Sequence, residues 1–212
     1  MSATTHSRTT VRATGRPGQW RGVEFVTLAV LGIAFGVAFW GWDVALYPLV
    51  KASLVFPPLE SLTLGVWLIP AVAGALLVRR PGAALYTEVI AATVEMFLGN
   101  QWGAGVMVSA GLQGLGVELA VALFAWRRFG PMIAMLAGAL AAVLEITVYE
   151  WWAYMPEYDW TWRFVALGAA VVSGVVVAGL GGFVIVRALA ATGVIDSFPP
   201  GVEHLRREGE PA

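Results

Sequence analysis

Four glutamates interrupt otherwise apolar stretches of this 212-residue chain, and their carboxylates are the groups best suited to bind a ligand there. They are Glu88, Glu95, Glu118 and Glu145. A carboxylate inside a bilayer costs free energy, so such a residue usually faces a cavity or a partner. Glu95 and Glu145 each follow a helix-starting proline by fourteen residues. The rise of an α-helix therefore places both carboxylates roughly 21 Å from the same end of the bundle.

The neighbours of these two outer glutamates favour a ligand site over a purely structural role. Amide, hydroxyl and aromatic groups occur in the same depth range, and they are Asn100, Gln101, Trp102, Ser109, Gln113, Tyr149 and Trp152. Ser109 and Gln113 are four residues apart, so both lie on one face of a helix. We predict that these residues form a substrate-binding site together with Glu95 and Glu145.

Glu88 and Glu118 lie nearer the opposite face, where a structural role competes with a coupling role. Arg79, Arg80 or backbone donors could satisfy either carboxylate as an ordinary buried group. The sequence favours this structural interpretation for the inner pair.

The composition restricts the class of protein. The chain is 58% hydrophobic and 13% charged, with a mean hydropathy of +0.75, whereas a soluble domain carries about a quarter charged residues. This argues against a nucleic-acid-binding domain and most soluble enzymes. The chain has no cysteine and two histidines, both in polar tails, and lacks GxxxxGK[ST], GxSxG and HExxH patterns. We therefore expect no enzyme activity, no cofactor and no metal site, and any ATPase motor would be another chain.

The segments that carry the glutamates are predicted to be membrane-spanning helices, each of which needs about 20 residues. The six predicted spans are approximately 25–42, 61–78, 81–98, 103–126, 131–149 and 164–186. This predicts an all-α, polytopic membrane domain over residues 23–191, with flexible tails at 1–22 and 192–212. Eleven of the thirteen basic residues fall on one side of this arrangement. Because Lys and Arg concentrate in cytoplasmic loops, both termini are expected in the cytoplasm of a multi-pass cell-membrane protein.

The opposite, outer half of the predicted bundle is acidic and aromatic. It holds seven acidic residues against two basic ones, and seven of the ten tryptophans. An acidic mouth attracts cations, and aromatic faces bind cations and flat rings. An interfacial belt alone would place tryptophans on both sides. We predict a cationic aromatic solute that arrives from outside.

Small residues recur at a spacing of four on two predicted helices. Gly32 and Gly36 lie on the first, and a longer stripe from Ala170 to Gly182 lies on the last. Such stripes let helix backbones approach closely. For the last helix we expect packing within the bundle. For the first, the sequence leaves packing and docking to another membrane subunit equally open.

The middle of the chain resembles the YkoE family. The resemblance rests on Arg80-Pro81-Gly82-Ala83-Ala84 with Glu88 and Glu95, on Gly99-Asn100-Gln101-Trp102-Gly103, and on Gln113-Gly114-Leu115-Gly116 with Glu118. Members of this family are substrate-binding S components of energy-coupling-factor (ECF) transporters. The likeness extends over about residues 24–190, and the block from Arg80 to Glu118 is its specific part.

The resemblance implies a six-helix S component that captures thiamine or its hydroxymethylpyrimidine precursor from outside. It also implies a transmembrane T component and two cytoplasmic ATPase subunits as partners in the bilayer. In this hypothesis Trp102 stacks on a thiamine-like cation, Glu95 or Glu145 binds its aminopyrimidine or thiazolium, and Gln101 and Gln113 contact ring nitrogens. Two alternatives stay open: a proton-coupled secondary transporter of a small cation, and a structural membrane subunit whose glutamates pair internally.

Overall fold

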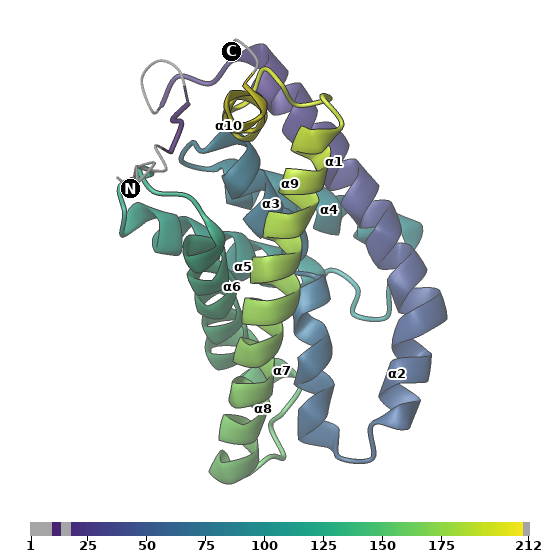
Figure 1. Ribbon diagram of the computed structural model, residues 1–212. Helices are drawn as coiled ribbons and strands as arrows, with labels where there is room; N and C mark the ends of the chain where they lie inside the picture. The colour runs from purple at the N-terminus through teal and green to yellow at the C-terminus, as the bar shows by residue number, and fades with distance from the viewer. Residues whose placement is uncertain (1–9, 14–17, 210–212) are drawn as a thin grey trace.

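The computed structural model of the protein describes residues 10–13 and 18–209, and these residues form only helices and connecting turns. The first half contains α1 (Gly22–Gly41), η1 (Trp42–Leu46), α2 (Tyr47–Ser53), η2 (Pro57–Val66), α3 (Ile69–Val78) and α4 (Ala83–Leu98). The second half contains α5 (Gly105–Ala122), α6 (Pro131–Glu145), η3 (Ile146–Glu150), α7 (Trp151–Ala153), α8 (Trp160–Ser173), η4 (Gly174–Leu180), α9 (Gly181–Ala191) and α10 (Pro199–Glu208). Because η1, η3 and η4 are π-helical turns inside longer helices, α1–η1–α2, α6–η3–α7 and α8–η4–α9 are continuous (Figure 1).

Five helices of the described chain are long and apolar enough to cross a membrane, by length and composition. They cover Gly22–Ser53, Pro57–Val78, Gly105–Ala122, Pro131–Ala153 and Trp160–Ala191. The helix predicted at 81–98 is present as α4, but it has 16 residues, fewer than the about 20 that a spanning helix needs. The all-α class is confirmed. The predicted end of the first helix at Trp42 is wrong, because Asp43 is buried inside the bundle and the helix continues past it.

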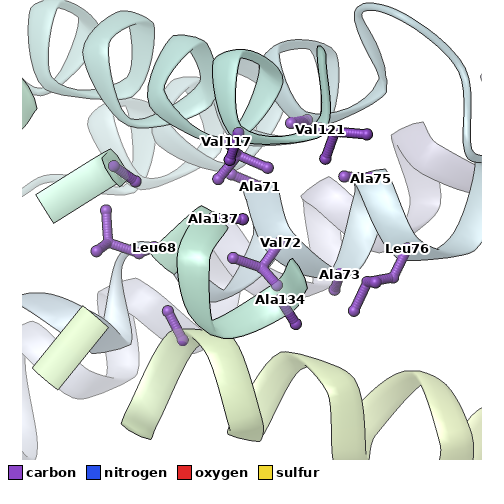
Figure 2. Packing of buried hydrophobic residues seen from close by; sticks show 14 of the residues in the cluster. Leu68, Ala71, Val72, Ala73, Ala75, Leu76, Val117, Val121, Ala134 and Ala137 are labelled. Atoms are coloured by element: carbon purple, nitrogen blue, oxygen red, sulfur yellow. The ribbon is translucent and has the colours of Figure 1, made fainter. Parts of the chain in front are cut away.

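The helix α3 lies at the centre of the bundle. Residues 70–78 of this helix are all buried, and α1, α4, α5, α6 and α9 all contact it. Figure 2 shows the small and branched side chains of α3, such as Ala71 and Val72, among Val117 and Val121 of α5 and Ala134 and Ala137 of α6. Small side chains at these positions let several helices approach one axis.

The stripe of small residues on the last long helix packs within the bundle, as predicted. A Cβ atom added at Gly138 of α6 would lie 2.0 Å from the carbonyl oxygen of Gly174 in η4. A Cβ atom added at Gly182 would lie 3.1 Å from the side chain of Val72 in α3. Any larger residue at Gly138 would force α6 and η4 apart.

The glycines of α1 also pack within the bundle. A Cβ atom at Gly32 would lie 2.8 Å from Ile90, and one at Gly36 would lie 2.5 Å from Val94, both on α4. The docking interpretation is therefore wrong for these two glycines, since α4 already covers the face that they form.

The start of α1 and the helix α10 lie at the same end of the bundle (Figure 1). The prediction of a flexible tail at 192–212 is wrong for its described part, because Pro199–Glu208 is helical and the side chains of Ile195 and Phe198 are buried. The apolar pair anchors this segment where composition alone indicates disorder. Most of the predicted tail at 1–22, with His6, Arg8 and Arg16, lies outside the described residues.

Candidate functional site

A cavity of about 460 Å³ lies in the half of the bundle opposite α10. Its wall is built by α1, α2, η2, α4, α5 and the segment from α6 to Tyr158. The polar and aromatic lining residues are Phe39, Tyr47, Lys51, Glu60, Ser61, Thr63, Trp67, Glu88, Glu95, Trp102, Ser109, Gln113, Glu145, Glu150, Tyr154 and Tyr158. A volume of this size is typical of small-molecule sites.

Glu95 faces the cavity from α4 and lies against Asp43 of η1. Glu95 is 1% exposed and Asp43 is 6% exposed. No well-formed hydrogen bond reaches Glu95 Oε1 or either carboxylate oxygen of Asp43 within the described chain. The π-helical turn of η1 carries Asp43 into the bundle, and such turns frequently occur at functional sites.

Glu145 brings a second buried carboxylate to the cavity from the end of α6. It lies beside Ser109 and Gln113, which project from one face of α5. Its Oε2 has no hydrogen-bond partner among the described residues. The structure thus joins Glu95, Glu145, Ser109 and Gln113 around one space, as their depth and spacing predict. Buried polar atoms without hydrogen-bond partners are unusual in folded proteins, so these oxygens distinguish the cavity from the rest of the bundle.

The inner glutamates accept hydrogen bonds from backbone donors, which was one of the two structural alternatives. Glu88 Oε2 accepts from the Ala71 amide at 2.8 Å, near the start of α3. Glu118 Oε1 accepts from the Ala84 amide at 2.8 Å, in the first turn of α4. Each satisfies an amide that lacks a partner within its own helix. Glu88 also reaches the cavity, whereas Glu118 is not part of its lining.

An aromatic cluster of Tyr47, Trp67 and Trp102 forms one wall of the cavity. The ring centroids of Trp67 and Trp102 are 5.3 Å apart, and those of Tyr47 and Trp102 are 5.4 Å apart, all edge to face. Asn100 Oδ1 accepts a hydrogen bond from the Trp102 amide at 2.8 Å, which fixes the turn that carries the indole. Asn100 therefore positions Trp102 without lining the cavity.

Charged and phenolic groups form the rim. Lys51 Nζ lies 2.8 Å from Glu60 Oε1, and the Tyr47 hydroxyl donates to the same carboxylate. Burial raises the pKa of Tyr154 and of Tyr158 above the usual range for a phenol. Both hydroxyls therefore stay neutral at physiological pH and can donate hydrogen bonds.

Besides Asn100, three other residues predicted for the site lie outside the cavity. Gln101 is exposed, and Trp152 is 61% exposed with its Nε1 donating to the Thr147 carbonyl at 3.0 Å. Tyr149 lies behind the wall, edge to face with Tyr154 at 5.6 Å between centroids. All three share the predicted depth. Tyr149 and Trp152 lie on helical turns that present only one side to the cavity, and Gln101 lies in the turn between α4 and α5.

The sequence reasoning missed Asp43, Tyr47, Glu60, Trp67 and Glu150 as members of the site. A signal for Asp43 exists, because the apolar residues resume after it and continue to Val50. A helix that passes through Asp43 places Tyr47 four residues later on the same face. Glu60 and Trp67 carry no comparable signal, since Glu60 lies in the 3₁₀ helix η2 and Trp67 directly follows it.

Comparisons with known proteins agree with this architecture. Residues 23–144 match the family described as an ABC-type cobalt transport system, permease component. The chain is 34% identical over 188 residues to the putative HMP/thiamine permease protein YkoE of Bacillus subtilis (strain 168), covering 87% of this chain and 92% of that protein. It also matches a crystal structure of an S-component of an ECF transporter, with a TM-score of 0.83 and 31% identity over 90% of this chain and 96% of that one. The chain therefore belongs to this permease-component family and, within it, to the YkoE-like S components of ECF transporters.

Proposed function

We propose that this protein captures thiamine or its hydroxymethylpyrimidine precursor in the cavity and presents it for import. The observation that carries the proposal is the pair of buried carboxylates, Glu95 and Glu145, whose unpartnered oxygens lie on a cavity walled by aromatic rings. A heterocycle that carries amino hydrogens or a positive charge matches those acceptors. The name of the Bacillus subtilis relative, HMP/thiamine permease, points to the same class of ligand.

The lining suggests how such a ligand would lie. Its flat ring would pack against Trp102 or Trp67, since aromatic faces bind cations and rings. Glu95 on one side and Glu145 on the other are the acceptors for amino hydrogens or for a thiazolium charge. Gln113 and Ser109 beside Glu145 offer both donors and acceptors for ring nitrogens and a hydroxyl group.

We infer that the cavity faces the outside and that both termini are cytoplasmic. The basic loops support this orientation, because Arg79, Arg80, Arg127 and Arg128 lie in the connections on the α10 side of the bundle. In this arrangement α4 is the sixth spanning helix, shortened to 16 residues and packed on α1 and α3. A transmembrane T component and two cytoplasmic ATPase subunits would supply the motion that opens the site inward.

The two alternative functions have less support. Membership among S components favours a binding subunit over a proton-coupled carrier or a purely structural subunit. The family description mentions cobalt, yet within residues 10–13 and 18–209 no three His, Cys, Asp or Glu side chains are grouped to hold a metal ion. An organic ligand fits the aromatic wall better than a bare ion does.

Tryptophan fluorescence of the purified full-length protein tests the proposal. Titration with thiamine and with hydroxymethylpyrimidine should give a saturable change in emission for at least one of them. Trp102→Phe should remove a large part of that change, whereas Trp152→Phe, which alters an indole outside the cavity, should leave it in place. The absence of saturable binding by either compound would contradict the proposed function.

A further inference from the structure

Asp43 and Glu95 are the most unusual pair of groups in the described chain. They come from two different elements, η1 and α4, and their carboxyl groups lie against each other, with Glu95 at the cavity and Asp43 behind it. Asp43 is 6% exposed and lies beside Trp67 as well as Glu95, but neither of its oxygens accepts a well-formed hydrogen bond, and Glu95 is 1% exposed with Oε1 in the same condition. Only Glu95 reaches the cavity. Asp43 therefore acts on any ligand through Glu95.

The two basic residues in the cavity half of the described chain, Lys51 and Arg163, are engaged elsewhere. Lys51 pairs with Glu60 at the rim. Arg163 lies over the rings of Trp152 and Trp160 and donates to the carbonyls of Tyr158 and Pro156. None of the ion pairs formed by the described residues includes Asp43 or Glu95.

The other titratable groups around the pair do not neutralise it. The groups that face this region are Tyr47 and Lys51 of α2, Glu60 of η2, Glu88 of α4, Glu145 of α6, Glu150 of η3, and Tyr154 and Tyr158 of the following loop. Apart from Lys51, which is already paired, these groups are acidic or neutral. Two facing carboxylates in a buried acidic region cannot both be ionised without a large Coulomb cost, and a proton held between them would remove that cost.

We propose that Asp43 and Glu95 form a carboxyl pair that holds one proton in the empty site and releases it when a positively charged ligand binds. The proposal rests on the proposed function, because it assumes that the ligand occupies the cavity at Glu95. On binding, the O–H bond of the shared carboxyl breaks and the proton passes to water or buffer through the cavity. One positive charge enters as one leaves, so the net charge of the buried site does not change.

This exchange separates two related ligands. A ligand with a fixed cation, such as the thiazolium of thiamine, replaces the proton and meets a doubly ionised pair. A neutral heterocycle, such as hydroxymethylpyrimidine, leaves the proton in place and meets a carboxyl that can donate a hydrogen bond. Asp43 is thus a positioning and specificity residue for the charge of the ligand.

Calorimetric titration of the full-length protein, repeated at one pH in buffers of different ionisation enthalpy, counts the protons released. With thiamine we expect a release of about one proton per ligand, and with hydroxymethylpyrimidine close to none. Asp43→Asn should reduce the thiamine-linked release to below about half of that value and weaken thiamine more than hydroxymethylpyrimidine. Glu157→Gln, at an exposed carboxylate outside the cavity, is the matched control and should change neither quantity.

Thiamine binding without buffer dependence, or unchanged release in Asp43→Asn, would overturn the carboxyl pair while leaving the proposed function intact. If neither compound binds, the proposed function fails. The pair is then tested in the empty protein by infrared difference spectroscopy. There, Asp43→Asn should remove a protonated carboxyl C=O band that Glu157→Gln retains, and an unchanged band would overturn the proposal.

Discussion

Buried charged groups form ion pairs at one end of this bundle and lack hydrogen-bond partners at the other. Near α10, Arg80 Nε lies 2.7 Å from Glu24 Oε2 with both side chains 1% exposed, and Arg79 Nη1 lies 2.6 Å from Glu203 Oε1. In the cavity half, the carboxylates of Asp43, Glu95 and Glu145 are equally buried but keep oxygens without partners. Paired charges hold the fold together, whereas unpaired ones retain binding capacity at a cost in stability.

The paired end also ties distant parts of the chain together. Arg79 holds Glu203 of α10 and donates to the Val11 carbonyl at 2.5 Å, and the Val11 amide donates to Glu203 at 2.7 Å. Glu24 forms an ion pair with Arg80, and its carboxylate also accepts a hydrogen bond from the Arg21 amide in a capping box at the start of α1. Substitutions at the α10 end should therefore lower the free energy of unfolding, whereas substitutions in the cavity half should weaken ligand binding.

The largest effect on stability is expected from Arg80→Ala. The substitution leaves the carboxylate of Glu24 buried with only Arg21 beside it, and breaking a buried ion pair costs about 3–5 kcal/mol. Unfolding of the detergent-solubilised variant, followed by circular dichroism, would measure this loss. Arg21→Ala is the control, since its side chain is 41% exposed and an exposed pair contributes about 0–1 kcal/mol. Equal stability of the two variants would contradict a stabilising role for the buried Arg80–Glu24 ion pair.

Glu95→Gln should have the largest effect on binding. It removes a charged acceptor from the cavity, and a hydrogen bond to a charged group is worth about 1.5–3 kcal/mol. Thiamine affinity should therefore fall by about 10- to 100-fold, as measured by calorimetry. The free energy of unfolding should stay the same or rise, because glutamine keeps the shape of the side chain and removes a buried ionisable group. Unchanged affinity would remove Glu95 from the site.

Glu203→Gln should loosen α10 without affecting the cavity. Arg79 keeps weaker acceptors, so the free energy of unfolding should fall by about 1–2 kcal/mol. Faster amide hydrogen exchange over Pro199–Glu208, with unchanged exchange over Gly105–Ala122, is the expected pattern. Glu208→Gln, at an exposed position on the same helix, should leave both segments unchanged. Amide exchange that rises equally throughout the bundle would argue against a role of the Arg79–Glu203 ion pair that is confined to α10.

The smallest effect is expected from Gln113→Ala, which removes a neutral polar group beside Glu145. A neutral hydrogen bond contributes about 0.5–1.5 kcal/mol, so thiamine affinity should drop by about 2- to 10-fold. Gln101→Ala is the matched control on an exposed glutamine outside the cavity and should leave affinity unchanged. A larger loss at Gln101 than at Gln113 would move the site away from the cavity.

The candidate site could be predicted in part because helical depth follows directly from residue number. Glu95, Glu145, Ser109 and Gln113 meet around one cavity, as the rise and periodicity of a helix imply. Gln101 and Trp152 share that depth but are exposed and do not line the cavity. Depth is a one-dimensional property that spacing supplies, whereas the facing of a side chain depends on how each helix rotates against its neighbours.

The amino-acid order was sufficient for the all-helical class, the acidic and aromatic character of one end and the family resemblance. These follow from composition, periodicity and local motifs. Only the assembled bundle places Asp43 against Glu95, turns Gly32 and Gly36 toward α4 and folds α10 onto Arg79. Each of these depends on contacts between segments far apart in the chain, where packing of the whole bundle outweighs local preference.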